Sequence, residues 1–339
     1  MQFLLISATS IRSSDAPFLL ADALRRAGHA VDLLPIDSDL PLVPAAGWRA
    51  EGAVDPVYRA WFQRRAWALA ETLNPDVVLL YGSNWSLEPE TVQRLRYRAG
   101  AQVVLWEINQ RLFSGAQALC LPLYDHVFCL DSYFLPVFKG GGLRCVEHLT
   151  AAADPAEHRP LDLADDEAQR YGADISFVGT YHPRRGALLA LLDGRDLQVR
   201  LYGYGWEQAG LPVAGWVRSE PVYGRKKTVL YCASRLSFHE RGPHMISGEN
   251  FRPFEVAACG GVTITRPSPD LLRCFVPGEE VLVFDQDEDF ASQVHKWVKD
   301  PARLASIGEA GRRRVLAEHT YDHRAAVICD HVSGGRHRS

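Results

Sequence analysis

An arginine and a glutamate lie one helical turn apart in the segment ENFRPFEVAACGGVTIT, residues 249–265. Residues 251–259 are predicted to form a short helix, because Pro253 suits the first turn and two glycines follow the last one. Arg252 and Glu255 are three residues apart, so they share one face of this helix. An arginine at the start of a helix can bind a phosphate group. The same two residues could also form an ordinary surface ion pair.

A second basic segment, FVGTYHPRRGALL, lies at residues 177–189. Gly179 is expected at the end of a strand, and Arg184 and Arg185 at the start of the next helix. Backbone N–H groups together with a guanidinium would form a phosphate clamp there. The spacing differs from the glycine-rich dinucleotide fingerprint and from the Walker A loop, which argues against NAD binding and against a P-loop ATPase. An exposed basic turn would explain the segment equally well.

Two more segments that follow predicted strands carry groups suited to ligand binding. In LYGYGW, residues 201–206, Gly205 would let the backbone approach a ligand closely, and Tyr204 could pack on a base or a sugar. The loop SFHERGPHMISGENF, residues 237–251, is rich in glycine and in polar groups that could bind hydroxyl groups. The residues of this loop that we single out are His239, Glu240, His244, Glu249, Asn250 and Phe251.

The first half of the chain offers one candidate for proton transfer. In VVLWEINQRLF, residues 103–113, a predicted strand ends at Glu107 and Asn109. A carboxylate at this position could accept a proton or bind the hydroxyl group of an acceptor. We therefore group Glu107, Asn109 and His239 as candidate catalytic residues.

These segments must be positioned by two series of alternating strands and helices. The first series has predicted strands at 3–7, 31–35, 75–82, 102–106, 126–130 and near Cys145, and helices at 16–28, 55–73, 87–100 and 132–139. The second has predicted strands at 174–180, 197–203, 235–239, 262–265 and 280–284, and helices at 183–193, 221–232, 251–259, 286–298 and 301–317. Such alternation predicts an α/β protein with parallel, doubly wound sheets. Ligands of these sheets bind at the carboxyl ends of the strands.

The same reading divides the chain into domains. A first Rossmann-like domain covers residues 1–150, a polar linker with two prolines covers 151–173, and a second Rossmann-like domain covers 174–321. A helix at 322–332 would cross back to the first domain, and the tail 333–339 is expected to be disordered. Two such domains are expected to face each other across a cleft.

The composition of the chain limits its possible binding partners and its cellular compartment. The net charge of −4 gives no general attraction to nucleic acid or to an acidic membrane surface. The seven cysteines form no CxxC pair, which favours reduced, buried thiols over a disulfide or zinc framework and points to the cytoplasm. No apolar stretch approaches the roughly 20 residues that a transmembrane helix requires. The oligomeric state is left open.

Several of these motifs occur in an order that resembles the CgeB-like family, also called spore maturation protein-like. They are VVLWEIN, HVFCLDSYF, DISFVG, LYGYGW, NFRPFEVAACGGVTIT, FVPGEEVLVFD and IGEAGRRRVLAEHTYDHR. The resemblance covers most of the chain, strongly from 174 to 324 and more loosely from 1 to 150. These proteins are glycosyltransferases related to the retaining enzymes with the GT-B fold.

The resemblance implies a fold and a set of roles. The fold would be GT-B, with an acceptor domain followed by a donor domain. Glu255 would hold the ribose hydroxyls of a nucleotide-diphosphate sugar, Arg252 would face the diphosphate, and Arg184 or Arg185 would bind phosphate. The donor nucleotide would also contact Gly179, Tyr204 and Gly205, and the donor sugar would contact His244, Glu249, Asn250 and Phe251.

The implied activity is a hexosyltransferase-like one that retains the anomeric configuration and favours a UDP-sugar. We expect neither cofactor nor metal, because DQD, residues 285–287, matches an acidic turn of the family and not a metal site. Family members often carry an aspartate near the position of Asn109, so this chain departs from the family there. Two alternatives stay open: a sugar-nucleotide epimerase of the same fold, and a non-catalytic protein that binds nucleotide sugars.

Overall fold

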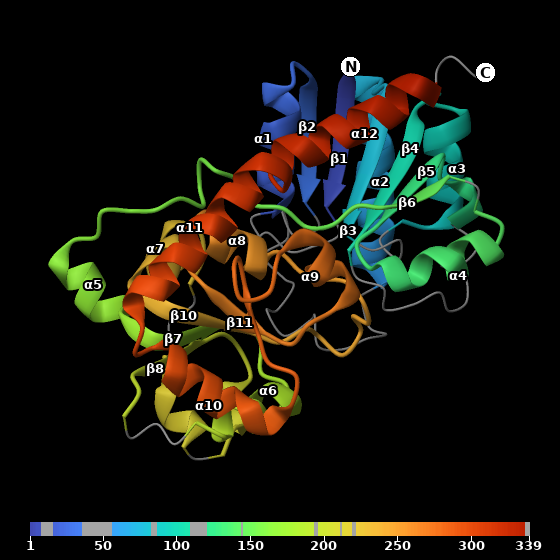
Figure 1. Ribbon diagram of the computed structural model, residues 1–339. Helices are drawn as coiled ribbons and strands as arrows, with labels where there is room; N and C mark the ends of the chain where they lie inside the picture. Colours follow the sequence, from blue (N-terminus) through green and yellow to red (C-terminus); the bar gives the residue numbers. More distant parts are fainter. Residues whose placement is uncertain are drawn as a thin grey trace. The chain divides into compact units, whose positions relative to one another are not determined.

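The computed structural model describes residues 1–7, 16–35, 56–82, 87–108, 121–143, 145–192, 196–210, 212–218 and 222–335 of the chain (Figure 1). The chain divides into two compact units. Unit 1 comprises residues 1–150, 244–246 and 321–339, and unit 2 comprises residues 151–243 and 247–320. Each unit is built around one six-stranded sheet.

The sheet of unit 1 is parallel throughout, with the strand order β2-β1-β3-β4-β5-β6. Its strands are β1 (Gln2–Ser7), β2 (Ala30–Pro35), β3 (Val77–Gly82), β4 (Gln102–Glu107), β5 (His126–Cys129) and β6 (Val146–His148). Every residue of β3 is buried, as expected for a central parallel strand that is covered on both faces.

Helices cover both faces of this sheet. They are α1 (Ala16–Arg26), α2 (Pro56–Leu73), α3 (Pro89–Tyr97), α4 (Leu135–Gly140) and α12 (Tyr321–Gly335). Successive residues of a strand point to opposite faces, so Val127 and Cys129 pack into the core beneath α2 and α3. Phe128 points to the other face, where its ring meets that of His331 on α12 edge to face. On the same face α12, near the end of the chain, lies beside α1, near its start (Figure 1).

The sheet of unit 2 is also parallel, with the strand order β12-β11-β10-β7-β8-β9. Its strands are β7 (Ala173–Val178), β8 (Val199–Tyr202), β9 (Val217–Arg218), β10 (Ser234–His239), β11 (Thr263–Thr265) and β12 (Leu282–Val283). Its helices are α5 (Asp165–Tyr171), α6 (Pro183–Ala190), α7 (Arg225–Ala233), α8 (Arg252–Ala258), α9 (Pro269–Cys274), α10 (Asp287–Trp297) and α11 (Pro301–Glu318). The predicted fold class, two parallel doubly wound α/β sheets, is confirmed.

The small residues of the 249–265 segment let α8 pack closely against α11. A Cβ atom on Gly311 of α11 would lie 3.4 Å from the Cβ atom of Ala257. A Cβ atom on Gly308 would collide with the backbone oxygen of Gly260. The two helices can approach this closely only because both contribute glycine or alanine at the contact.

Several elements differ from the sequence-based expectation. The expected linker, 151–173, belongs to unit 2 and contains α5, which has three acidic residues in its first turn and buries Tyr171. Acidic residues favour the start of a helix because of the helix dipole. The short elements α9 and β9 were not predicted, and α12 continues to Gly335 inside the expected disordered tail. Residues 336–339 lie outside the described residues.

The six described cysteines are free thiols. Three are buried and two are half-buried, but Cys145 is exposed, so the expectation of a buried thiol is wrong at this position. Cys145 immediately precedes β6, the edge strand of its sheet, where one side of the chain is uncovered. Among the described helices, none combines the length and apolar character needed to cross a membrane.

Candidate functional site

The strand order of unit 2 reverses between β7 and β10, since the chain moves from β7 to β8 on one side and from β10 to β11 on the other. Open parallel sheets bind ligands at such a switch point, outside the carboxyl ends of the strands. Gly179 directly follows β7, and His239 is the last residue of β10. Two of the candidate residues therefore lie where the topology alone would place a ligand.

Arg252, the first residue of α8, has a half-buried guanidinium that pairs with no carboxylate among the described residues. Its Cζ atom lies 5.7 Å from the centre of the Phe177 ring. A Cβ atom on Gly179 would come within 2.8 Å of Nη2 of Arg252, so a glycine is needed to leave room for the guanidinium. The backbone N–H of Arg252 donates to Oδ1 of Asn250 over 3.1 Å, which fixes the start of α8. The site thus holds a positioned cation that is ready to bind an anion.

Arg185 has a different environment, because it is buried and hydrogen-bonded. Its Nε and Nη2 atoms donate to the backbone oxygen of Glu240 over 3.1 and 2.8 Å, and its Nη1 atom donates to that of Thr180 over 2.8 Å. Its Cζ atom lies 5.3 Å from the centre of the Phe177 ring, the ring that Arg252 also approaches. Burial, followed by the charge of Arg252, lowers the pKa of Arg185 to about 9. Arg185 therefore anchors the loops around the site and adds positive potential to it.

Arg184 is half exposed and forms ion pairs with two carboxylates. Its guanidinium lies 3.2 Å from a carboxylate oxygen of Glu240 and 3.2 Å from one of Asp287. Arg266 pairs with the same Asp287. Of the two adjacent arginines, neither is a free phosphate clamp of the kind that the sequence predicted.

The carboxylate of Glu255 is buried between α8 and α7. Its Oε1 atom accepts a hydrogen bond from Nζ of Lys227 over 2.8 Å, and its Oε2 atom accepts one from the hydroxyl of Tyr231 over 3.2 Å. Nε2 of His158 lies 3.6 Å from Oε1. Burial by itself would raise the pKa of Glu255, but the charges of Lys227, His158 and Arg252 outweigh it and lower the pKa to about 2. The carboxylate is therefore ionised at neutral pH.

Sequence analysis did not single out the partners of Glu255. Lys227 and Tyr231 are four residues apart on α7, so they lie on one face of this helix. This spacing could have indicated that both side chains bind the same group. His158 lies in the expected linker, where the sequence carries no such signal. Its Nδ1 atom accepts a hydrogen bond from the backbone N–H of Asp154 over 3.2 Å, so the neutral tautomer carries its proton on Nε2, toward Glu255.

The low pKa of Glu255 predicts acid sensitivity. A carboxyl group whose pKa is lowered by folding contributes stability above its unfolded pKa, and this contribution is lost as the pH falls through the folded pKa. The loss should therefore occur between pH 4.5 and about pH 2, and it should amount to about 3 kcal/mol. Urea unfolding of the wild type and of Glu255→Gln across this pH range would test it. The wild type should lose stability more steeply than the variant, and parallel curves would contradict the prediction.

His239 and Glu249 form the centre of a buried polar network. Nε2 of His239 lies 2.8 Å from Oε2 of Glu249. Oε1 of Glu249 accepts hydrogen bonds from Nη1 of Arg241 over 3.0 Å and from Oγ of Ser268 over 2.8 Å. Burial lowers the pKa of His239, although the neighbouring Glu249 opposes the change. Glu249, which is fully buried, thus fixes the position of His239, whose buried Nδ1 atom has no partner among the described residues.

The LYGYGW segment lies beside Gly179. A Cβ atom on Gly203 would collide with the backbone oxygen of Gly179, and Nε1 of Trp206 donates to this oxygen over 2.8 Å. Gly205 has a φ of 83°, a conformation that favours glycine. Tyr204 is exposed, and its hydroxyl lies 3.1 Å from that of Tyr223. The segment therefore supplies backbone close to the switch point and one accessible aromatic ring.

Phe251 belongs to this group, because it immediately precedes α8, and it is half-buried. Not every candidate residue does. His244 belongs to unit 1, as does Glu107, which is buried at the end of β4. Asn109 lies outside the described residues. Unit 2 alone therefore brings together the candidate residues at Gly179, Arg184 and Arg185, Tyr204 and Gly205, His239, and Glu249 to Glu255.

Unit 2 also has a cavity at the other end of α8. Its volume is about 270 Å³, and its lining includes Cys232, Cys259, Gly260 and Pro301. It also includes residues at the amino ends of β10 and β11, the strand ends opposite the switch point. The cavity thus lies at the end of α8 opposite Arg252, although Tyr231, the partner of Glu255, also lines it.

Part of the chain, within the second half, resembles one family of known proteins. Residues 184–330 match the family model described as "Glycosyl transferase-like". The chain therefore carries a glycosyltransferase-like domain, and the match includes Arg184, His239, Arg252 and Glu255. No curated protein sequence matches the chain.

Solved structures share the fold over nearly the whole chain. Sucrose-phosphate synthase from Thermosynechococcus elongatus is 17% identical with a TM-score of 0.72, and the match covers 100% of both chains. A glycosyltransferase from Rickettsia africae is 10% identical with a TM-score of 0.69, and the match covers 98% of both. HepE from Anabaena, solved in complex with UDP-glucose, is 11% identical with a TM-score of 0.64, and the match covers 97% of this chain and 99% of that one. The two parallel sheets are those of the GT-B fold.

Proposed function

We propose that this protein is a glycosyltransferase that takes its sugar from a nucleotide-diphosphate donor. The observation that carries the proposal is the guanidinium of Arg252, which pairs with no carboxylate among the described residues and lies next to Gly179 at the end of β7. The ionised Glu255 lies one turn further along the same helix. The glycosyltransferase-like match of residues 184–330 supports it. From the order of the sequence motifs we also propose that the chain belongs to the CgeB-like family.

The donor nucleotide binds along the carboxyl ends of β7 and β10. Arg252 binds the diphosphate through its planar guanidinium, which can donate two parallel hydrogen bonds. Glu255 binds the ribose, since a carboxylate has about four acceptor positions and the described contacts use one on each oxygen. Tyr204 packs against the base, while Gly179 and Gly205 allow close approach of the backbone. A UDP-sugar is favoured, since the similarly folded HepE was solved with UDP-glucose.

The donor sugar lies near the end of β10. Nδ1 of His239 is buried and has no partner among the described residues, so it is suited to bind a sugar hydroxyl. Glu249 holds the ring of His239 in place over 2.8 Å and does not itself reach the sugar. Asn250 and Phe251, which lead into α8, complete the sugar site.

In the transfer step the bond between the anomeric carbon and the diphosphate breaks, and a bond from the acceptor's hydroxyl oxygen to that carbon forms. Negative charge develops on the leaving diphosphate, which accepts the proton of the hydroxyl group. Arg252, with Arg185 behind it, stabilises this charge. The resemblance implies retention of configuration, for which such enzymes require no protein nucleophile, and no metal ion is assigned to this step. Unit 1 takes the acceptor, which could be a small molecule, a glycan or a protein, with Glu107 and Asn109 as candidates for contact with its hydroxyl group.

A panel of UDP-, GDP- and dTDP-sugars, incubated with the full-length protein and analysed by mass spectrometry, tests the proposal. Transfer of the sugar or slow hydrolysis of the donor would support it. Interconversion of the sugar would favour an epimerase, and saturable binding without turnover would favour a non-catalytic binding protein. A chain that binds and turns over none of the donors would overturn the proposal.

A further inference from the structure

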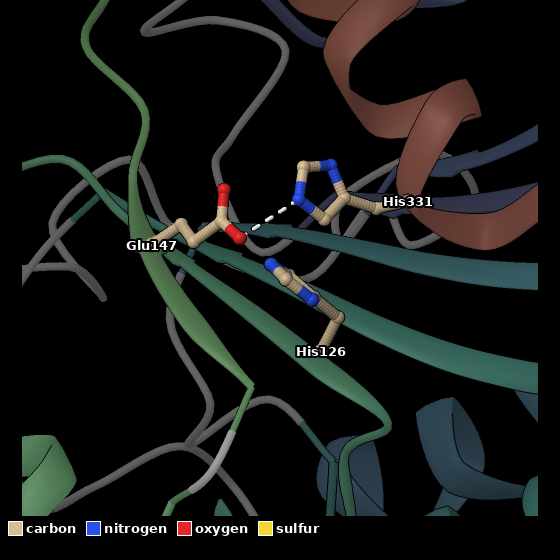
Figure 2. A group of neighbouring side chains, drawn as sticks. All are labelled: His126, Glu147 and His331. Atoms are coloured by element: carbon tan, nitrogen blue, oxygen red, sulfur yellow. Dashed lines mark hydrogen bonds and ion pairs between the residues drawn. The ribbon is translucent and has the colours of Figure 1, made fainter. Parts of the chain in front are cut away.

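Three side chains with metal-binding atoms converge in unit 1. They are His126 at the start of β5, Glu147 in β6 and His331 in α12 (Figure 2). One ligand atom from each lies within 4.8 Å of the other two, and Nε2 of His331 is 2.8 Å from Oε1 of Glu147. In the described part of the chain, no other three histidine, cysteine or acidic side chains meet in this way.

Strand pairing explains why His126 and Glu147 share a face. In the register of β5 and β6, Phe128 lies opposite Glu147, and His126 is two residues before Phe128 on the same side of its strand. This is the face that α12 covers, and the ring centres of His126 and His331 are 4.6 Å apart. The backbone geometry therefore holds two of the groups on the sheet, while α12 brings the third.

One ring nitrogen of His126 has incomplete hydrogen bonding. Nε2 of His126 is buried and has no hydrogen-bond partner among the described residues. A buried imidazole nitrogen without a partner carries a free-energy cost unless something else satisfies it. A cation held between the three side chains would satisfy this nitrogen.

His331 is oriented as metal-binding histidines are. Its Nδ1 atom lies 2.8 Å from the backbone oxygen of Val327, one turn earlier on α12. Donation from Nδ1 to this carbonyl fixes the orientation of the ring, with Nε2 donating to Glu147 in the metal-free protein. A cation that replaces this proton would meet Nε2 and the carboxylate together. Backbone carbonyls commonly orient metal-bound histidines in this way.

We propose that His126, Glu147 and His331 bind one divalent cation of the zinc class. Two imidazole nitrogens and a carboxylate oxygen suit Zn²⁺ and its neighbours, whereas Mg²⁺ and Ca²⁺ prefer oxygen ligands alone. Ligands at about 2.0–2.2 Å from a tetrahedral zinc ion lie about 3.4 Å apart. The three ligand atoms now lie within 4.8 Å of one another, so small rotations of the side chains would complete the site. Glu147, which is exposed, can make such a rotation, and water fills the remaining coordination position.

The consequence of binding would be to join α12 to the sheet of unit 1. The ligands come from two neighbouring strands and from a helix that follows them by almost two hundred residues. A cation at this point therefore closes a long loop of chain and should stabilise the folded position of α12.

Zinc binding can be measured on the full-length, tag-free protein after removal of metals with a chelator. Isothermal titration with ZnCl₂ should give one site per chain, and Mg²⁺ should give none. Glu147→Gln, His331→Gln and His126→Phe should each weaken zinc binding at least about 100-fold. Glu147→Gln changes an exposed side chain and preserves the fold, and His126→Phe keeps a ring that packs against Phe128.

His323→Gln is the matched control, because it removes another histidine of α12 that lies outside the cluster. This variant should bind zinc as the wild type does. In the wild type but not in Glu147→Gln, zinc should also slow hydrogen exchange in α12. Wild-type protein that binds no zinc, or zinc binding that survives Glu147→Gln and His331→Gln unchanged, would overturn the proposal.

Discussion

Replacement of Glu255 by alanine should lower the free energy of unfolding by about 3–5 kcal/mol, because it removes the carboxylate that pairs with the largely buried ammonium group of Lys227. The side chains of Glu255 and Lys227 are only 8% and 12% exposed, so water cannot easily replace the lost carboxylate. The hydroxyl of Tyr231 loses its acceptor as well. Urea unfolding followed by circular dichroism would measure the change.

The same variant should bind UDP more weakly, but instability alone could also weaken binding. The double variant Glu255→Gln/Lys227→Met separates these effects, since it removes both charges and keeps both side chains at similar size. We expect it to recover most of the lost stability. Its affinity for UDP should nevertheless remain lower by about 1–3 kcal/mol, because the charged acceptor for the ribose hydroxyls is gone. A stable double variant that binds UDP as tightly as the wild type would refute the ribose-binding role of Glu255.

Sequence patterns were enough to predict the elements that carry the site. The alternation of apolar strands and amphipathic helices predicted both sheets, because parallel strands are buried on two faces and helices on one. The helix with Arg252 and Glu255 was predicted for a local reason, its proline at the start and glycines at the end. Short elements such as α9 and β9 were missed because too few residues carry a periodic signal.

Tertiary contacts decided which charged residues are free, and the sequence pattern does not contain them. Arg184 and Arg185 are adjacent, so successive positions of α6 turn one outward and bury the other. Glu249 was predicted to touch the sugar, yet it lies in a buried network with His239 of β10, Arg241 after this strand and Ser268 just before α9. The pairing of Glu255 with Lys227 joins residues on different helices. In the same way, His126, Glu147 and His331 meet only when the sheet and α12 have folded together.

Replacement of Arg252 by alanine should lower the affinity for UDP by about 10–150-fold, which corresponds to the loss of hydrogen bonds from a charged donor. Folding stability should change by less than about 1 kcal/mol, because the guanidinium pairs with no carboxylate among the described residues. It contributes a contact with Phe177 and a longer-range attraction to Glu255. Removal of this charge also relieves its repulsion with Arg185. Calorimetric titration with UDP and urea unfolding would give the two numbers.

Two further variants test whether the effect belongs to this guanidinium in particular. Arg252→Lys keeps the charge but loses the planar fork, so it should recover only part of the affinity. Arg185→Ala should show the opposite balance, with a larger loss of stability, since three hydrogen bonds to the backbone oxygens of Glu240 and Thr180 disappear. If Arg252→Ala lowered stability as much as Arg185→Ala and left the affinity for UDP intact, Arg252 would be a structural residue. The diphosphate would then have to bind elsewhere on unit 2.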